Sequence, residues 1–186
     1  MKYNAVVIGG SAGSFPVVTK ILSTIPKNFN IPIIMCLHRL KYVRHGFVEA
    51  LNLKSNLPVI EPDDKEPIKN GIVYLAPANY HLYVEVGNYF ALSTEDMVNY
   101  SRPAIDLTFD TASYAYRDKL IAIILSGANS DGAQGMRIAK NRGAFTIVQH
   151  PDEATIKTMP EAALKATTID KSLTSDEIVN LLKTIY

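Results

Sequence analysis

Four short apolar runs, rich in β-branched residues, are spaced along the chain and bounded by glycine, proline or polar residues. They are AVVIGG (residues 5–10), IPIIMCLH (31–38), LIAIILSG (120–127) and AFTIV (144–148). Continuous apolar runs of this length are typical of strands that are buried on both faces of a parallel sheet. The pattern therefore predicts a central parallel sheet.

Between these runs, apolar residues recur every three or four positions, which is the period of an amphipathic helix. Pro16 and Pro103 suit first-turn positions, and the capping-box pattern TSDE predicts a last helix from Ser175 to about Ile185. Alternation of strands and helices predicts an α/β fold, with a doubly wound, mostly parallel sheet and helices on both faces. The other helical stretches are FPVVTKILSTI (15–25), VRHGFVEALNL (43–53), AIDLTFDTASYAY (104–116) and GAQGMRIAKNR (132–142).

The segment from about Pro58 to Ser93 has a different pattern. Its apolar stretches GIVYLAP and HLYVEVGNYFALS alternate as strands do, around an apparent turn at Gly87–Asn88, with no helix between them. We expect a small antiparallel β-hairpin insertion there. A chain of 186 residues is long enough for one sizeable core, so residues 1–186 are predicted to form a single domain.

Composition narrows the class of protein. The chain is 47% hydrophobic and 20% charged with a net charge of +1, which is typical of a soluble protein and gives no indication of nucleic-acid binding. The mixed cluster RLKYVR (39–44) is interpreted as a solvated helix face. No apolar run reaches the length of a membrane span, so no membrane insertion is expected. A lone cysteine, Cys36, lies in an apolar run, which favours a buried thiol and a reducing cytoplasm.

The first strand leads into a serine framed by glycines. Gly9, Ser11 and Gly13 fit G-x-S-x-G, the spacing of a nucleophile elbow, in which a sharp strand-to-helix turn exposes the hydroxyl. A glycine-rich loop before a helix can also hold an anion, so a nucleotide-binding α/β domain is an alternative. The further glycines of a dinucleotide motif are displaced, however, and the second strand ends in His38-Arg39 rather than in an acidic residue, which disfavours that alternative.

Two further residues complete a candidate hydrolase site. A serine nucleophile needs a base, and His38 ends the second predicted strand. Asp131, in the loop of LSGANSDGAQG, can hold the imidazole and stabilise its cation. The carboxyl ends of parallel strands share one edge of a sheet, so we expect Ser11, His38 and Asp131 to meet there. For Asp131 alone, a helix cap is the alternative.

The remaining histidines are interpreted as structural. His45 lies in a predicted helix, His81 in the hairpin and His150 in a loop before a proline. Scattered histidines and a single cysteine do not have the spacing of a metal site, so neither a metal nor another cofactor is expected.

Six segments spread over nearly the whole chain carry a resemblance to a known family. They are VVIGGSAGS (6–14), CLHR (36–39), GIVYLAPANYHL (71–82), VNYSRPAIDLTF (98–109), ILSGANSDGAQGM (124–136) and TMPEAAL (158–164). In the order and spacing of these segments the chain resembles the catalytic domain of the CheB chemotaxis protein-glutamate methylesterases. The order Ser, His, Asp also differs from the Ser, Asp, His order of α/β-hydrolases.

The resemblance implies a role for each candidate residue. Ser11 would be the nucleophile, His38 the general base and then acid, and Asp131 the residue that orients His38. The backbone N–H groups of Ala12 and Ala128 would stabilise the oxyanion. The implied substrate is a glutamate γ-methyl ester on a methylated chemoreceptor or another methyl-accepting signalling protein, with release of methanol. Deamidation of particular glutamines at the same site is a further implied activity.

Some positions depart from the commonest family form. Ser14 stands where a second glycine is usual, Ala12 replaces a common threonine, Ala104 a frequent serine, and Ala128 a methionine. None of these changes removes one of the three candidate side chains. The family's full-length members carry an amino-terminal receiver domain, whereas this chain begins directly at the catalytic domain, so regulation by a fused receiver is not expected. The alternative from another class is a catalytically idle module that docks on a receptor.

Overall fold

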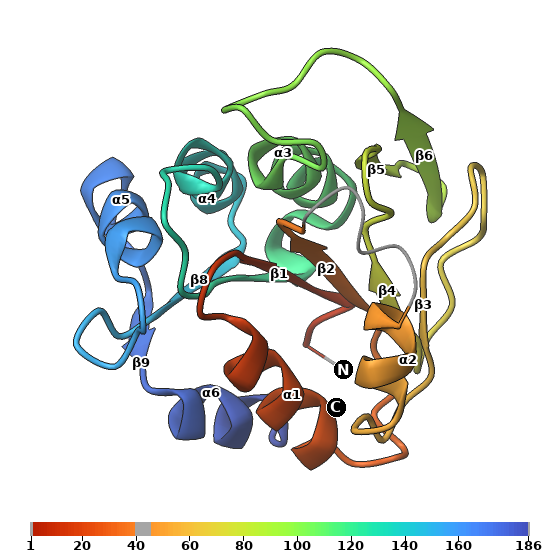
Figure 1. Cartoon of the computed structure of the whole chain (residues 1–186), viewed down its shortest axis with the longest axis horizontal. Coiled ribbons are helices and arrows are strands. Elements are labelled where there is room, and N and C mark those ends of the chain that lie inside the picture. Colours follow the sequence, from red (N-terminus) through yellow and green to blue (C-terminus); the bar gives the residue numbers. More distant parts are fainter. Residues whose placement is uncertain (1, 40–45, 186) are drawn as a thin grey trace.

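The described part of the computed structural model, residues 2–39 and 46–185, is built around a seven-stranded sheet (Figure 1). Every neighbouring pair of strands is parallel. In spatial order the strands are β3 (Val59–Ile60), β4 (Val73–Leu75), β2 (Ile33–Leu37), β1 (Ala5–Gly10), β7 (Leu120–Ile124), β8 (Phe145–Gln149) and β9 (Lys171–Leu173). All four predicted apolar runs are strands of this sheet, which confirms the prediction.

The chain enters the sheet at its centre. β1 pairs with β2 on one side and with β7 on the other, so the order reverses direction beside β1. In open parallel sheets the loops at such a switch point enclose a crevice at the carboxyl ends of the strands. The loops after β1, β2 and β7 carry Ser11, His38 and Asp131, respectively.

Helices cover both faces of the sheet, as predicted for a doubly wound fold (Figure 1). Alternate residues of β1 serve the two cores: Val6 and Ile8 pack with α1, α2 and α6, whereas Val7 packs with α3, α4 and α5. The helices are α1 (Phe15–Thr24), α2 (Phe47–Asn52), α3 (Ile105–Tyr116), α4 (Ala133–Asn141), α5 (Thr158–Ala166) and α6 (Ser175–Leu182), and a short 3-10 helix, η1 (Arg117–Lys119), follows α3.

The helix termini agree with the sequence signals at most positions. Pro16 lies in the first turn of α1, and Thr174 caps α6 by accepting a hydrogen bond from the Glu177 N–H. Pro103 is different: it precedes α3, which begins at Ile105 after an extended Ala104. α5 was not among the helices predicted from the pattern. Of the helix predicted over 43–53, residues 46–53 are described, and α2 begins at 47.

The antiparallel insertion is smaller than predicted. β5 (His81–Glu85) and β6 (Tyr89–Ser93) pair as an antiparallel hairpin around the expected turn, with Asn88 at φ 69°. Val59–Ile60 and Val73–Leu75 instead join the parallel sheet, which corrects the prediction for these residues. β4 is buried at all three positions, and strands of two or three residues are too short for their pattern to distinguish the two kinds of sheet. The hairpin packs on α3, where the Thr108 hydroxyl donates to the Leu82 carbonyl at 2.8 Å.

Candidate active site

Ser11 and His38 follow the ends of two adjacent strands. Gly10 of β1 lies opposite Leu37 of β2, and the His38 N–H donates to the Gly10 carbonyl at 3.1 Å. Neighbouring strands are about 4.8 Å apart, so Ser11 and His38, the next residue on each strand, lie side by side at the same edge of the sheet. The Ser11 carbonyl accepts hydrogen bonds from both the N–H and the hydroxyl of Ser14, which closes the turn into α1. Ser14, one of the departures noted above, therefore helps to fix the Ser11 loop.

His38 is paired with Asp131. The His38 Nε2 lies 2.8 Å from Asp131 Oδ2, and the side chains are 14% and 0% exposed. Because a carboxylate accepts hydrogen bonds, Nε2 carries a proton in this pair, and Nδ1 is the nitrogen left to accept a proton from a hydroxyl. Within the described residues, the Ser11 hydroxyl makes no hydrogen bond, either to His38 or to any other group. An apo structure can lack such a contact between a hydroxyl and an imidazole, so its absence does not argue against a functional pairing of Ser11 with His38.

The amino terminus of α3 holds the Asp131 carboxylate. Oδ2 accepts from the Ile105 N–H at 2.7 Å, and Oδ1 accepts from the Asp106 N–H at 3.1 Å. Free N–H groups and the helix dipole both favour a negative charge at this position. Burial raises the pKa of Asp131, but the hydrogen bonds from His38, Asn99 and these N–H groups outweigh it and hold the pKa below its ordinary value. Asp131 is therefore a buried carboxylate that stays ionised.

Asn99 links Asp131 to a second carboxylate. Its side-chain amide donates to Asp131 Oδ1 at 3.0 Å and to Asp106 Oδ2 at 2.7 Å. Burial, and then the nearby charge of Asp131, raises the pKa of Asp106, although a hydrogen bond from the Gly135 N–H opposes the shift. The sequence analysis did not single out Asn99, because a loop asparagine 32 residues from Asp131 carries no spacing signal of its own.

A glycine is required directly after Asp131. Gly132 has φ 92°, in the left-handed region, and a Cβ there would lie 2.6 Å from Ile124 Cδ1 and 2.7 Å from Ile105 Cγ2. This close approach lets the start of α4 pack against the start of α3. Asp131 can therefore reach the N–H groups of α3 because Gly132 has no side chain.

The loops that carry Ala12 and Ala128 lie after β1 and β7, and both alanines are exposed. In the described part of the chain, neither alanine N–H donates to another protein group. Ser126 joins these loops: its hydroxyl lies 2.8 Å from the Ala12 carbonyl, and its own carbonyl accepts from the Ser11 N–H at 2.9 Å. Ser126 was not among the predicted residues, since a serine at the end of a strand has no distinguishing pattern.

The histidines outside the site are placed as interpreted, with one exception. His81 is buried in β5, where its ring lies between the Asp96 carbonyl and the Ala104 N–H, and His150 lies in the loop after β8. His45 lies outside the described residues. Cys36 is fully buried, and burial raises the pKa of its thiol, as expected for a core residue. Among residues 2–39 and 46–185, no three His, Cys, Asp or Glu side chains gather as a metal site.

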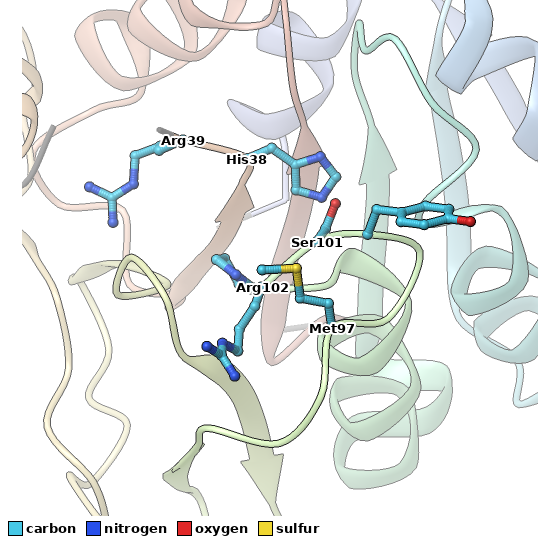
Figure 2. A pocket seen from close by; sticks show the side chains of 7 residues that line it. His38, Arg39, Met97, Ser101 and Arg102 are labelled. Atoms are coloured by element: carbon cyan, nitrogen blue, oxygen red, sulfur yellow. The ribbon is translucent and has the colours of Figure 1, made fainter. Parts of the chain in front are cut away.

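A cavity of about 240 Å³ opens beside His38, and Figure 2 shows its lining side chains. Arg39 belongs to this lining and is only 4% exposed, bonded to Glu61 and to the Ala76 carbonyl. The interpretation of Arg39 as part of a solvated helix face is therefore wrong, because the residue lies outside any helix, two positions after the end of β2, and its side chain packs inward. Residues 40–44 lie outside the described residues. The lining is completed by Met97, Tyr100, Ser101, Arg102 and Pro103.

No helix within the described ranges combines the length and the apolar character that crossing a bilayer requires.

Comparisons with known proteins agree with this architecture. A family model described as CheB methylesterase matches residues 6–182. A Leptospira interrogans relative is 44% identical over 97% of this chain and 94% of its own length. A protein-glutamate methylesterase/protein-glutamine glutaminase of Clostridium acetobutylicum is 31% identical over 96% of this chain but only 53% of its own length. The crystal structure of the Thermotoga maritima CheB methylesterase catalytic domain superposes with a TM-score of 0.94 at 32% identity, covering 100% of both chains. The chain belongs to the CheB methylesterase family.

Proposed function

We propose that the chain is a protein-glutamate methylesterase in which Ser11, His38 and Asp131 act as a catalytic triad. The observation that carries the proposal is the 2.8 Å pairing of His38 Nε2 with the buried Asp131, beside the strand end that presents Ser11. The arrangement supplies a nucleophile, a base and a group that fixes the base, which acyl transfer requires. On this proposal, residues 1–186 form one catalytic domain.

In the first half of the reaction, Nδ1 of His38 takes the proton of the Ser11 hydroxyl as its oxygen attacks the γ-ester carbonyl. The imidazolium that forms is stabilised by the Asp131 carboxylate through Nε2. The Ala12 and Ala128 N–H groups, which have no protein acceptor within the described residues, are available to the developing oxyanion. Return of the proton to the departing methoxide releases methanol and leaves an acyl-enzyme.

In the second half, His38 removes a proton from a water molecule as its oxygen attacks the carbonyl of the acyl-enzyme. This attack forms a second tetrahedral oxyanion. Collapse returns the proton to Ser11 and leaves a free glutamate on the substrate. Deamidation of a glutamine follows the same path with ammonia as the leaving group. The chemistry needs only the groups of this chain, and no cofactor is invoked.

The names of the relatives indicate a protein that carries glutamate methyl esters as the class of substrate. The substrate that fits this proposal is a methylated chemoreceptor or another methyl-accepting signalling protein, as the family resemblance implies. The rim of the cavity suits a protein substrate, because Met97 and Tyr100 are 47% and 99% exposed there. Exposed apolar side chains beside a catalytic histidine can pack on the surface that carries the ester.

The test is methanol release from a methylated receptor cytoplasmic domain. Ser11→Ala and His38→Ala should each lower the turnover number by a factor on the order of 10⁴ to 10⁶. Ser23→Ala, at an exposed position, and His150→Ala, whose side chain is 45% exposed, are the matched controls and should retain the native rate. Full activity in Ser11→Ala would refute the mechanism.

The native protein also distinguishes the methylesterase from its two alternatives, a receptor-docking module and a nucleotide-binding domain. A folded native protein that releases no methanol yet binds the receptor domain would indicate a docking module. Saturable binding of a nucleotide in calorimetry, lost when the loop from Gly9 to Ser14 is altered, would favour a nucleotide-binding domain instead.

A further inference from the structure

The turn before Arg102 has a backbone that residues other than glycine seldom adopt. Val98 and Ser101 pair across it: the Val98 N–H donates to the Ser101 carbonyl at 3.2 Å, and the Ser101 N–H to the Val98 carbonyl at 2.9 Å. The two central residues, Asn99 and Tyr100, have φ values of 52° and 59°. Two positive φ values are the mark of a type I′ turn, in which asparagine followed by glycine is preferred. Tyr100 therefore stands where glycine is favoured.

The conformation of Asn99 is explained by its contacts. Asparagine tolerates the left-handed region better than most residues, and here its amide donates to both Asp131 and Asp106. The Ser101 hydroxyl adds a bond within the turn, to the Asn99 carbonyl at 3.3 Å. Because Asp131 is also bonded to His38, the position of the turn is fixed relative to the candidate triad.

Tyr100 has no such contacts. Its side chain is 99% exposed, the highest exposed fraction of any large hydrophobic side chain in the described part of the chain. Within the described residues, its phenol makes no hydrogen bond and its ring packs on no other aromatic ring. A left-handed φ is unfavourable for a bulky residue, and no interaction of this side chain offsets it. Strain of this kind gathers at active sites and ligand-binding segments, where function retains it.

The place of Tyr100 in the fold agrees with a role in binding. It lines the cavity beside His38 together with Met97 and Ser101, and Figure 2 shows these two neighbours on the loop that passes His38. A γ-ester is only one side chain away from the backbone that carries it. For its carbonyl to reach Ser11 and His38, the surface of the substrate protein must approach the residues around His38. A small free ester has no such surface.

We propose that Tyr100 is a substrate-binding residue that packs on the protein surface around the esterified glutamate, so that the enzyme prefers esters on a receptor domain to small free esters. The inference rests on the methylesterase function proposed above. Tyrosine suits this role because it offers a large, rigid contact area, and it is enriched among the residues that dominate binding energy. A turn that holds the ring in place beforehand reduces the entropy lost on binding. The unfavourable φ of Tyr100 is the consequence of that placement.

The test compares two substrates within each protein by methanol release. They are a methylated receptor cytoplasmic domain and a single capped residue, the γ-methyl ester of N-acetylglutamate α-methylamide. The measured quantity is the ratio of their kcat/KM values, because a ratio within one protein cancels any general loss of activity. In Tyr100→Gly this ratio should fall about tenfold, mainly through a higher KM for the receptor domain. Tyr100→Phe keeps the ring and should keep the ratio within about twofold.

Stability separates a binding role of Tyr100 from a structural one. Because glycine adopts a left-handed φ freely, Tyr100→Gly should raise the melting temperature by about 2–4 °C while it lowers the substrate ratio. Lys65→Gly is the matched control, since Lys65 is exposed, has φ 62° and lies outside the cavity lining. It should gain similar stability and keep the native ratio. An unchanged ratio in Tyr100→Gly, or a Tyr100→Phe variant that loses as much as Tyr100→Gly, overturns the inference.

Calorimetry with Ser11→Ala distinguishes failure of this inference from failure of the proposed function. The double variant Ser11→Ala/Tyr100→Gly should bind the methylated receptor domain about tenfold more weakly than Ser11→Ala does. If the native protein releases no methanol from either substrate but this difference is found, recognition by Tyr100 stands and the esterase does not. If the native protein hydrolyses both substrates and the two variants bind the domain equally, the esterase stands and the role of Tyr100 is overturned.

Discussion

Asp131 shows how a single carboxylate can be fully buried and still be negatively charged. It accepts hydrogen bonds from His38, Asn99, two N–H groups of α3 and the Gly132 N–H. Five donors replace the water that burial removes, so the charged form is retained. Asparagine, a neutral residue of the same shape, would have to turn its amide NH₂ toward some of these donors and could not accept their hydrogen bonds.

Replacement of Asp131 by asparagine should therefore impair catalysis strongly. The expected loss in turnover number for methanol release is on the order of 10⁴, because His38 loses the partner that fixes its tautomer and stabilises its cation. Asp152→Asn, at a side chain that is 91% exposed, is the matched control and should retain the native rate. A loss of less than about tenfold in Asp131→Asn would mean that Asp131 does not orient the base.

The same carboxylate makes stability depend on pH. Because its folded-state pKa is lowered, the folded protein binds fewer protons than the unfolded chain near the ordinary carboxyl pKa, and Asp131 stabilises the fold above that value. This contribution is lost as the pH falls through the folded pKa, so the free energy of unfolding should fall as the pH drops below the ordinary carboxyl pKa. The fall should be shallower in Asp131→Asn, measured by urea unfolding at each pH. Parallel curves for the two proteins would contradict the lowered pKa.

Among the elements, α3 contributes most to the site. Its first N–H groups hold Asp131, Asp106 in its first turn binds the Gly135 N–H of α4 at 2.6 Å, and Thr108 binds the hairpin. The sequence predicted the helix and the aspartate, each from a local pattern. It did not predict that the two would meet, because the contact depends on how two helices from distant segments cross. Asn99 was missed because a loop asparagine has no spacing signal, and Arg39 was assigned to a solvated helix face although its side chain packs inward.

Gly132→Ala tests the close packing of α3 and α4. The left-handed φ and the clash with Ile105 and Ile124 should together destabilise the fold by more than about 1 kcal/mol and shift the N–H groups away from Asp131, lowering activity. Gly71→Ala is the control, since Gly71 also has a left-handed φ of 72° but its Cβ would meet only the Phe29 carbonyl, at 3.6 Å. Thermal unfolding and methanol release are measured for both. Equal effects in the two variants would show that packing at Gly132 is unimportant.

For the whole molecule, the apolar runs of the sequence were sufficient to predict the layers of the fold. Residues buried on both faces of β1, β2 and β7 required helices on each side, and the structure has them. The edge strands β3 and β9 were not predicted as parts of this sheet, and β4, within the predicted strand GIVYLAP, was assigned to the antiparallel insertion. Strands of two or three residues are too short for their pattern to place them in one kind of sheet. The two cores are separate clusters, and only one of them contains α3.

The separation of the cores predicts unequal functional effects of core substitutions. Ile178→Ala in α6 and Phe109→Ala in α3 both remove fully buried side chains, and each should cost about 2–5 kcal/mol of stability. Only Phe109→Ala should also reduce turnover at temperatures well below unfolding, because α3 positions Asp131. Stability is measured by urea unfolding. Turnover is compared at 15 °C below each variant's own melting temperature, a margin roughly four to eight times the shift that 1 kcal/mol produces in a domain of this size. Equal loss of turnover in both variants would argue against a special role of α3.

The position of β1 between β2 and β7 also has a consequence for synthesis of the chain. Ser11 and His38 leave the ribosome before β7 and can be brought together by β1 and β2, but β7 and Asp131 are translated about a hundred residues after β1. Until then, one edge of the central strand is open to pairing with other strands, which is a hazard for a nascent chain. Ribosome-bound chains should therefore depend on chaperones until residues 120–124 emerge, and esterase activity should first arise when the aspartate loop has joined the sheet.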